Sequence, residues 1–89
     1  MMFEVYVSGK AKKFFRNLDR KIADELISAV SFLKTSPVPV KEFDIKKLAG
    51  ETDSYRIRMG RYRILYTVYW DEKIIRISKI EMKGETTYK

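Results

Sequence analysis

The stretch that decides the fold of this chain is Ser54-Tyr-Arg-Ile-Arg-Met-Gly-Arg-Tyr-Arg-Ile-Leu-Tyr-Thr-Val-Tyr69. On both sides of Gly60, apolar and polar residues alternate with period two, which is the pattern of two half-buried β-strands. Gly60 followed by Arg61 suits a two-residue type II′ turn, because that turn needs a positive φ at its first central position. The stretch therefore predicts a β-hairpin with one apolar face.

The two-residue turn also predicts which residues of the hairpin face each other. The core-facing pairs are Met59 with Tyr62, Ile57 with Ile64 and Tyr55 with Tyr66. The same register sets Arg58 across from Arg63 on the outer face, with side chains starting about 5 Å apart. Like charges so placed ordinarily destabilise a sheet, so we interpret the pair as a site for an anion. The alternative is a basic face that is simply solvated.

The composition restricts the chemistry that this chain can perform. Its 89 residues suffice for one domain, expected over residues 1–89. A net charge of +7 favours polyanionic partners. With no Cys and no His, the chain cannot carry a disulfide, a thiolate nucleophile, a Ser-His-Asp triad or a metal held by those ligands. We therefore expect no metal site and no cofactor.

We also expect a cytoplasmic protein with no membrane partner. No apolar run approaches the roughly 20 residues that a membrane-spanning helix requires. The N-terminus shows no signal-peptide pattern.

Periodicity predicts the remaining elements. Alternation over residues 3–7 predicts a strand, helical spacing predicts helices over residues 10–18 and 20–34, and alternation returns over residues 73–82. Residues 40–53 show no clear period and are expected to form a loop anchored by Phe43, Ile45 and Leu48. The predicted fold is α+β, with a helical hairpin packed on a four-stranded antiparallel sheet in the order β-α-α-β-β-β.

The last strand carries a break in its pattern. A two-residue turn at Asp71-Glu72 pairs Val68 with Ile75 and Tyr66 with Ile77. Beyond that point, strict alternation would turn Lys79 and Glu81 toward the core and expose Ile80 and Met82. We therefore expect a bulge, a twist or the sheet edge after Ile77.

The whole chain resembles toxins of the RelE/ParE superfamily, and most closely the archaeal RelE-type toxins. The segments that carry the resemblance are residues 37–50, with Lys47-Leu-Ala-Gly50 at their end, the run from Tyr55 to Tyr66, the Lys83-Gly84 pair and the terminal Tyr88-Lys89. The most specific of them is Tyr-Arg-Ile-Arg followed by Gly-Arg-Tyr-Arg-Ile-Leu-Tyr.

The resemblance implies the toxin of a type II toxin–antitoxin system. Such a toxin is a metal-independent endoribonuclease that enters the ribosomal A site and cuts mRNA by attack of a 2′-OH group. The implied partners are a RelB-like antitoxin, the ribosome and mRNA, with no small-molecule cofactor. The implied catalytic residues are Arg58, Arg63, Lys83 and Tyr88.

Further basic residues are candidates for binding RNA phosphates. They are Arg56, Arg61, Arg76 and Lys47. Arg56 and Arg58 stand where the bacterial proteins have lysines, and arginine stays protonated at any usable pH, so neither is a plausible general base. Lys83 stands where an arginine is usual, and it is the best candidate for a proton donor.

Two other functions fit the same fold. A ParE-like protein would inhibit DNA gyrase by binding and would need no ribonuclease residues. A basic nucleic-acid-binding module would bind without cleaving, with a steep dependence on salt.

Overall fold

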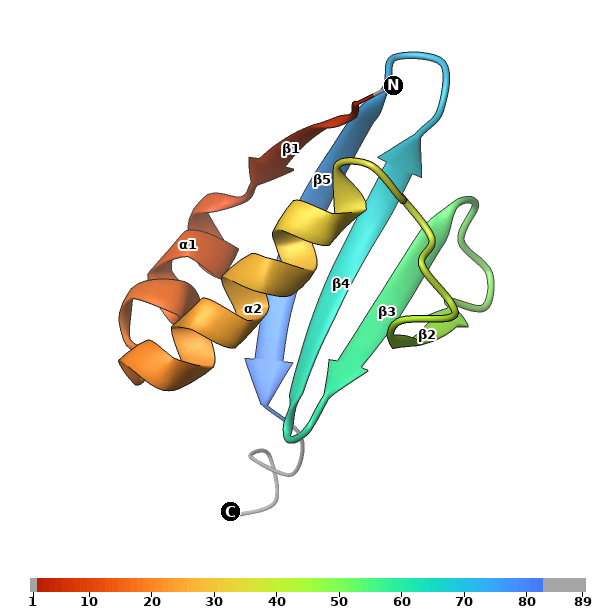
Figure 1. Cartoon of the computed structure of the whole chain (residues 1–89). Helices are drawn as coiled ribbons and strands as arrows, with labels where there is room; N and C mark the ends of the chain where they lie inside the picture. The colour runs from red at the N-terminus through yellow and green to blue at the C-terminus, as the bar shows by residue number, and fades with distance from the viewer. Residues whose placement is uncertain (1, 83–89) are drawn as a thin grey trace.

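The computed structural model describes residues 2–82, which form two helices and a five-stranded sheet (Figure 1). In chain order the elements are β1 (Glu4–Val7), α1 (Gly9–Arg16), α2 (Arg20–Leu33), β2 (Asp44–Lys47), β3 (Ser54–Met59), β4 (Tyr62–Tyr69) and β5 (Ile74–Met82). The strand order across the sheet is β1-β5-β4-β3-β2. Strand β1 is parallel to β5, and all other neighbours are antiparallel.

The predicted α+β class and helical hairpin are confirmed, but the predicted sheet is wrong in strand count and direction. The fifth strand, β2, lies in the segment expected to be a loop. It has four residues, of which only Ile45 is apolar, so it is too short to show a period. The parallel pairing of β1 with β5 joins strands that are about 70 residues apart, and no local pattern encodes such a contact.

The predicted register of the central hairpin is confirmed. Met59 pairs with Tyr62, Ile57 with Ile64, Tyr55 with Tyr66 and Arg58 with Arg63. Gly60 has φ +60°, and within residues 2–82 the other positive φ values belong to Gly50, Asp53 and Lys73. A positive φ at Gly60 together with a negative φ at Arg61 is the combination of a type II′ turn.

A β-bulge explains why the pattern of β5 breaks. Tyr66 pairs with Ile77 while Leu65 pairs with Lys79, so Ser78 is the extra residue. Ser78 Oγ donates to the carbonyl of Leu65 at 3.2 Å, and Ser8 Oγ donates to the carbonyl of Ser78 at 2.9 Å. The bulge buries Ile80, whose exposed fraction is 6%, and it turns the two charged residues beside Ile80 outward.

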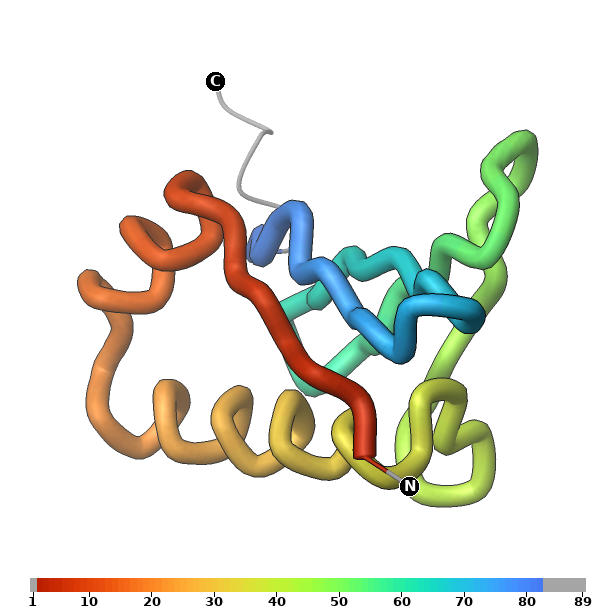
Figure 2. The backbone as a smooth tube through the Cα atoms, turned by 90° about the horizontal axis from the view of Figure 1, so that it is seen from above, coloured from red at the N-terminus to blue at the C-terminus, as the bar shows by residue number. Residues whose placement is uncertain are grey.

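The core lies between α1, α2 and one face of the sheet. Figure 2 shows α2 running along that face, with α1 beside β1 and β5. The fully buried side chains include Leu26 and Leu33 from α2 and a group from the central strands: Ile57, Ile64, Tyr66, Val68, Ile75 and Ile77. Within residues 2–82, neither helix is long and apolar enough to span a membrane. The opposite face of β3 and β4 carries no described helix.

We expect Tyr66→Phe to lower the free energy of unfolding by about 1–2 kcal/mol. The Tyr66 hydroxyl donates a hydrogen bond to the carbonyl of Pro37 at 2.8 Å, and no other described donor is positioned for that oxygen. Burial also raises the pKa of Tyr66, so the folded chain keeps this proton while the unfolded chain loses it above about pH 10. Stability should therefore fall above pH 10, and less steeply in the variant. Urea unfolding against pH measures both effects.

Tyr69→Phe is the control for this prediction, because Tyr69 is 42% exposed. Equal stability losses in the two variants would show that the contact with Pro37 contributes nothing.

Candidate functional site

The candidate site is the outer face of the sheet, meaning the side chains of β2 to β5 that point away from the helices. The strand register arranges them in rows. The first row is Asp44, Arg58, Arg63 and Glu81, one residue from each strand in spatial order. The second row is Lys46, Arg56, Leu65 and Lys79. Neighbouring residues in a row start about 5 Å apart, so five other charged side chains and Leu65 surround Arg58 and Arg63.

The first row has an arginine pair at its centre and a carboxylate at each end. Arg58 Nε donates to Asp44 Oδ2 at 2.9 Å, and Arg58 Nη2 lies 2.9 Å from the same oxygen. Arg63 Nε lies 3.5 Å from Glu81 Oε2 on the other side. The two arginines therefore repel each other less than their pairing alone suggests, because each has an opposite charge on its outer flank.

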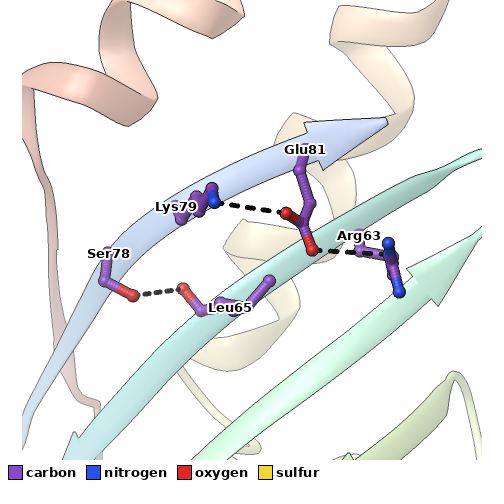
Figure 3. Close-up of polar contacts among 5 residues, drawn as sticks. All are labelled: Arg63, Leu65, Ser78, Lys79 and Glu81. Carbon is purple, nitrogen blue, oxygen red and sulfur yellow. Dashed lines mark hydrogen bonds and ion pairs between the residues drawn. The ribbon is translucent and has the colours of Figure 1, made fainter. Parts of the chain in front are cut away.

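Glu81 is shared between two cations. Its second oxygen, Oε1, lies 3.4 Å from Lys79 Nζ, and Figure 3 shows the carboxylate between the side chains of Lys79 and Arg63. The side chains of Arg63 and Glu81 are 27% and 29% exposed, so this contact is less hydrated than the pair of Asp44 and Arg58, at 59% and 49%.

Two arginines on this face have an unsatisfied donor. The Nε groups of Arg56 and Arg63 are buried and make no hydrogen bond within residues 2–82. The contact of Arg63 with Glu81 is close enough for an ion pair but does not have hydrogen-bond geometry. A buried donor without an acceptor raises the free energy of the folded state. Both arginines therefore leave a buried donor unpaired in the part of the folded chain that the structure describes.

The second row is purely cationic apart from Leu65. Lys46, Arg56 and Lys79 have no carboxylate in register with them, although Lys79 reaches Glu81 in the first row. Leu65 is half-buried among them. An apolar side chain surrounded by cations fits a nucleotide, whose base contacts apolar surface and whose phosphate pairs with the cations.

The structure brings some of the predicted site residues together and separates others. Arg56, Arg58 and Arg63 share the outer face, and Arg76 is exposed on β5 beyond Lys79. Arg61 is exposed in the turn. Lys47 pairs with Tyr55 and so falls on the other side of the sheet, where it is exposed at the edge. Lys83 and Tyr88 lie outside the described residues.

Four residues of this face were missed as site candidates: Asp44, Lys46, Lys79 and Glu81. The first two lie in β2, which has no periodic signal. The other two point outward only because of the bulge at Ser78, and strict alternation would have placed them in the core. Within residues 2–82, no group of three or more Asp, Glu, His or Cys side chains is close enough to hold a metal ion.

With this geometry established, comparison with known proteins places the chain in a family. Residues 5–85 match the family model described as the ParE toxin of type II toxin–antitoxin systems, parDE. The chain belongs to this family. It is also 37% identical, over its full length and 98% of the relative, to a Methanocaldococcus jannaschii protein named "Putative toxin RelE1". The family is part of the RelE/ParE superfamily, as the sequence resemblance indicated.

Solved structures agree with the assignment. The archaeal RelE–RelB complex from Pyrococcus horikoshii OT3 contains a chain that superimposes with a TM-score of 0.86 at 32% identity, covering 97% of this chain and 100% of that one. The intact RelBE complex of E. coli matches with a TM-score of 0.77 at 22% identity, covering 93% and 98% of the two chains. The second likeness shows the fold alone.

We expect the ion pair of Asp44 and Arg58 to contribute little to stability, about 0.2–1 kcal/mol, because both side chains are about half exposed. A double-mutant cycle with Asp44→Ala, Arg58→Ala and the double variant, measured by urea unfolding, gives this coupling energy. A coupling well above 1 kcal/mol would mean that Arg58 is retained for stability and not for binding.

Proposed function

We propose that this toxin is a metal-independent endoribonuclease that enters the ribosomal A site and cuts mRNA there. The observation that carries the proposal is the pairing of Arg58 with Arg63 on adjacent central strands, on a face without a described helix. Two guanidinium groups at this spacing suit the non-bridging oxygens of one phosphate, because arginine binds phosphate in a bidentate manner.

The proposed chemistry depends on positioning and electrostatics. Attack by a 2′-OH group on the adjacent phosphorus requires an in-line arrangement, stabilisation of the negative charge on the phosphorane and a proton for the 5′ leaving oxygen. Arg58 and Arg63 would stabilise the phosphorane. Lys83 would donate the proton, and Tyr88 would stack on a base or hold the sugar.

Flanking phosphates would be held by the remaining cations of the outer face. Arg56, with Lys46 and Lys79 in the same row, is suited to the neighbouring phosphate. Arg76 and Arg61 lie further out and would contribute phosphate contacts without base selectivity. Lys47 is the weakest of the predicted phosphate contacts because of its place on the other side of the edge strand.

The proposed cellular partner is a RelB-like antitoxin in the cytoplasm. Support comes from the structural relatives, which are described as RelE–RelB and RelBE complexes. A chain with net charge +7 and a row of cations on its uncovered face would bind a complementary acidic segment with a strongly salt-dependent rate of association.

We expect Arg63→Ala to abolish mRNA cleavage while the fold survives, because Arg63 is on the outer face and contributes nothing to the apolar core. The loss should be about 10²-fold or more in rate, as for removal of one group that stabilises the transition-state charge. Primer extension on an mRNA, with and without translating ribosomes, measures cleavage, and circular dichroism checks the fold.

Lys21→Ala is the matched control for this prediction. It removes one positive charge from the exposed side of α2, away from the outer face. Full cleavage by Arg63→Ala, or a similar loss in both variants, would contradict the assignment of Arg63.

Inhibition of DNA gyrase is the second candidate function, and the observation that favours it is the match of residues 5–85 to the ParE toxin model. A supercoiling assay separates the two functions. Inhibition of supercoiling without any cleaved mRNA would replace the ribonuclease proposal. Salt-sensitive binding of RNA with neither activity would point to a basic binding module of the same fold.

A further inference from the structure

The proposed ribonuclease reaction needs a group that takes the proton from the attacking 2′-OH, and none of the residues assigned above has this role. The chain contains no histidine, and the guanidinium and ammonium groups that dominate the outer face are hydrogen-bond donors without an acceptor. A carboxylate is the remaining kind of side chain on this face that accepts a proton and is ionised at neutral pH. The outer face of β2 to β5 presents two carboxylates, Asp44 and Glu81, and they differ in their contacts.

Asp44 already accepts a hydrogen bond from Arg58. Its Oδ2 accepts the hydrogen bond from Arg58 at 2.9 Å, and it lies at the sheet edge on the four-residue strand β2 with 59% of its side chain exposed. A base at such an edge is well hydrated and loosely positioned. Asp44 is therefore a counter-ion for Arg58 and a poor proton acceptor.

Glu81 has the opposite properties. Each of its oxygens is near a cation, at 3.5 Å from Arg63 Nε and 3.4 Å from Lys79 Nζ, and the contact with Arg63 does not have hydrogen-bond geometry. Charge-assisted N–H···O bonds are about 2.7–2.9 Å long, so these contacts hold the carboxylate without using up its lone pairs. Glu81 is thus fixed in place and still able to accept a proton.

The β-bulge at Ser78 places Glu81 on the outer face. Because Ser78 is an extra residue in β5, Glu81 points to the outer face and lies opposite Arg63. The hydroxyl of Ser78 bonds the carbonyl of Leu65, and the hydroxyl of Ser8, the N-cap of α1, bonds the carbonyl of Ser78 (Figure 3 shows the first of these). The bulge that sets the direction of Glu81 is therefore hydrogen-bonded to both a neighbouring strand and the N-cap of a helix.

We propose that Glu81 is the general base of the cleavage reaction, an inference that rests on the ribonuclease function proposed above. With the scissile phosphate between Arg58 and Arg63, the adjacent ribose lies within reach of the residue across from Arg63. Glu81 Oε2 takes the 2′-OH proton as the 2′ oxygen forms its bond to phosphorus. The bond between phosphorus and the 5′ oxygen then breaks, and the leaving oxygen keeps the electron pair and receives a proton from water.

The products are a 2′,3′-cyclic phosphate and a 5′-OH, and Glu81 returns its proton to solvent. Lys79 and Arg63 have a defined part in this scheme. Both lie beside the carboxylate when it takes the proton and becomes neutral. Arg63 then no longer pairs with a charged Glu81, and it stabilises the negative charge that develops on the phosphorane.

The test is Glu81→Gln, which keeps a side-chain oxygen to contact Arg63 but cannot accept a proton. We expect the single-turnover rate of mRNA cleavage on programmed ribosomes to fall about 10²- to 10⁴-fold, the usual contribution of a general base. Affinity for the ribosome complex should stay the same or rise, since the outer face becomes more positive. A rate within threefold of wild type would overturn the proposal and leave Glu81 as a positioning residue for Arg63.

Glu4→Gln is the matched control. Glu4 also lies on the outer side of the sheet, on β1, and its contact is the hydroxyl of Tyr6 at 2.7 Å. The control makes the same change of charge and shape on an edge strand that does not pair with the strands of Arg58 and Arg63, so cleavage should stay within about twofold of wild type. An equal loss in both variants would indicate a general electrostatic effect and reject the assignment of Glu81.

Glu81→Ala supplies a second readout that also decides the case if the glutamine variant fails to fold. Added formate should restore cleavage by this variant severalfold, because a small carboxylate can occupy the space left by the side chain and take the proton. No response to formate in a folded alanine variant would contradict the proposal. Cleavage absent from the wild-type protein would instead reject the ribonuclease function itself.

Discussion

The structure depends on one constraint, the register of β3 against β4 that the turn at Gly60 imposes. Side chains alternate between the two faces of a strand, so a shift by one residue would turn the apolar core face outward and bring arginines into the core. Ile57 and Ile64 are fully buried, while Arg58 and Arg63, each one residue away, lie on the outer face. The core and the candidate phosphate site are therefore two consequences of the same pairing.

The cost of that pairing is the repulsion between two arginines, and the neighbouring strands reduce it. Asp44 on β2 and Glu81 on β5 place a negative charge on the outer side of each arginine. These contacts are partly exposed and add little to stability. Their effect is local, because they hold two guanidinium groups next to each other. Not all N–H groups of these arginines are hydrogen-bonded, since Arg63 Nε remains unsatisfied within residues 2–82. At the proposed site, a phosphate would bind with little rearrangement, which is the kind of preorganisation that stabilises a transition state.

The bulge at Ser78 shows how a small irregularity joins the core to the site. It brings Ile80 into the core and sends Lys79 and Glu81 to the outer face. A regular strand could not bury both Ile77 and Ile80, because these residues are separated by an odd number of positions and would point to opposite faces. The hydroxyl groups of Ser8 and Ser78 hold the irregular backbone through hydrogen bonds, which connect the bulge to α1 and to β4.

The sequence by itself determined the helical hairpin, the hairpin of β3 and β4 and the pairing of Arg58 with Arg63, because these follow from local periodicity and from one turn whose geometry only glycine adopts easily. It also indicated that β5 must break its alternation, although not where the two charged residues would point. Only the tertiary structure decided that β2 forms, that β1 runs parallel to β5, and that Asp44 and Glu81 complete the row of arginines. Those features are contacts between strands distant in the chain or too short to have a period, so their energy comes from neighbours that no local pattern specifies.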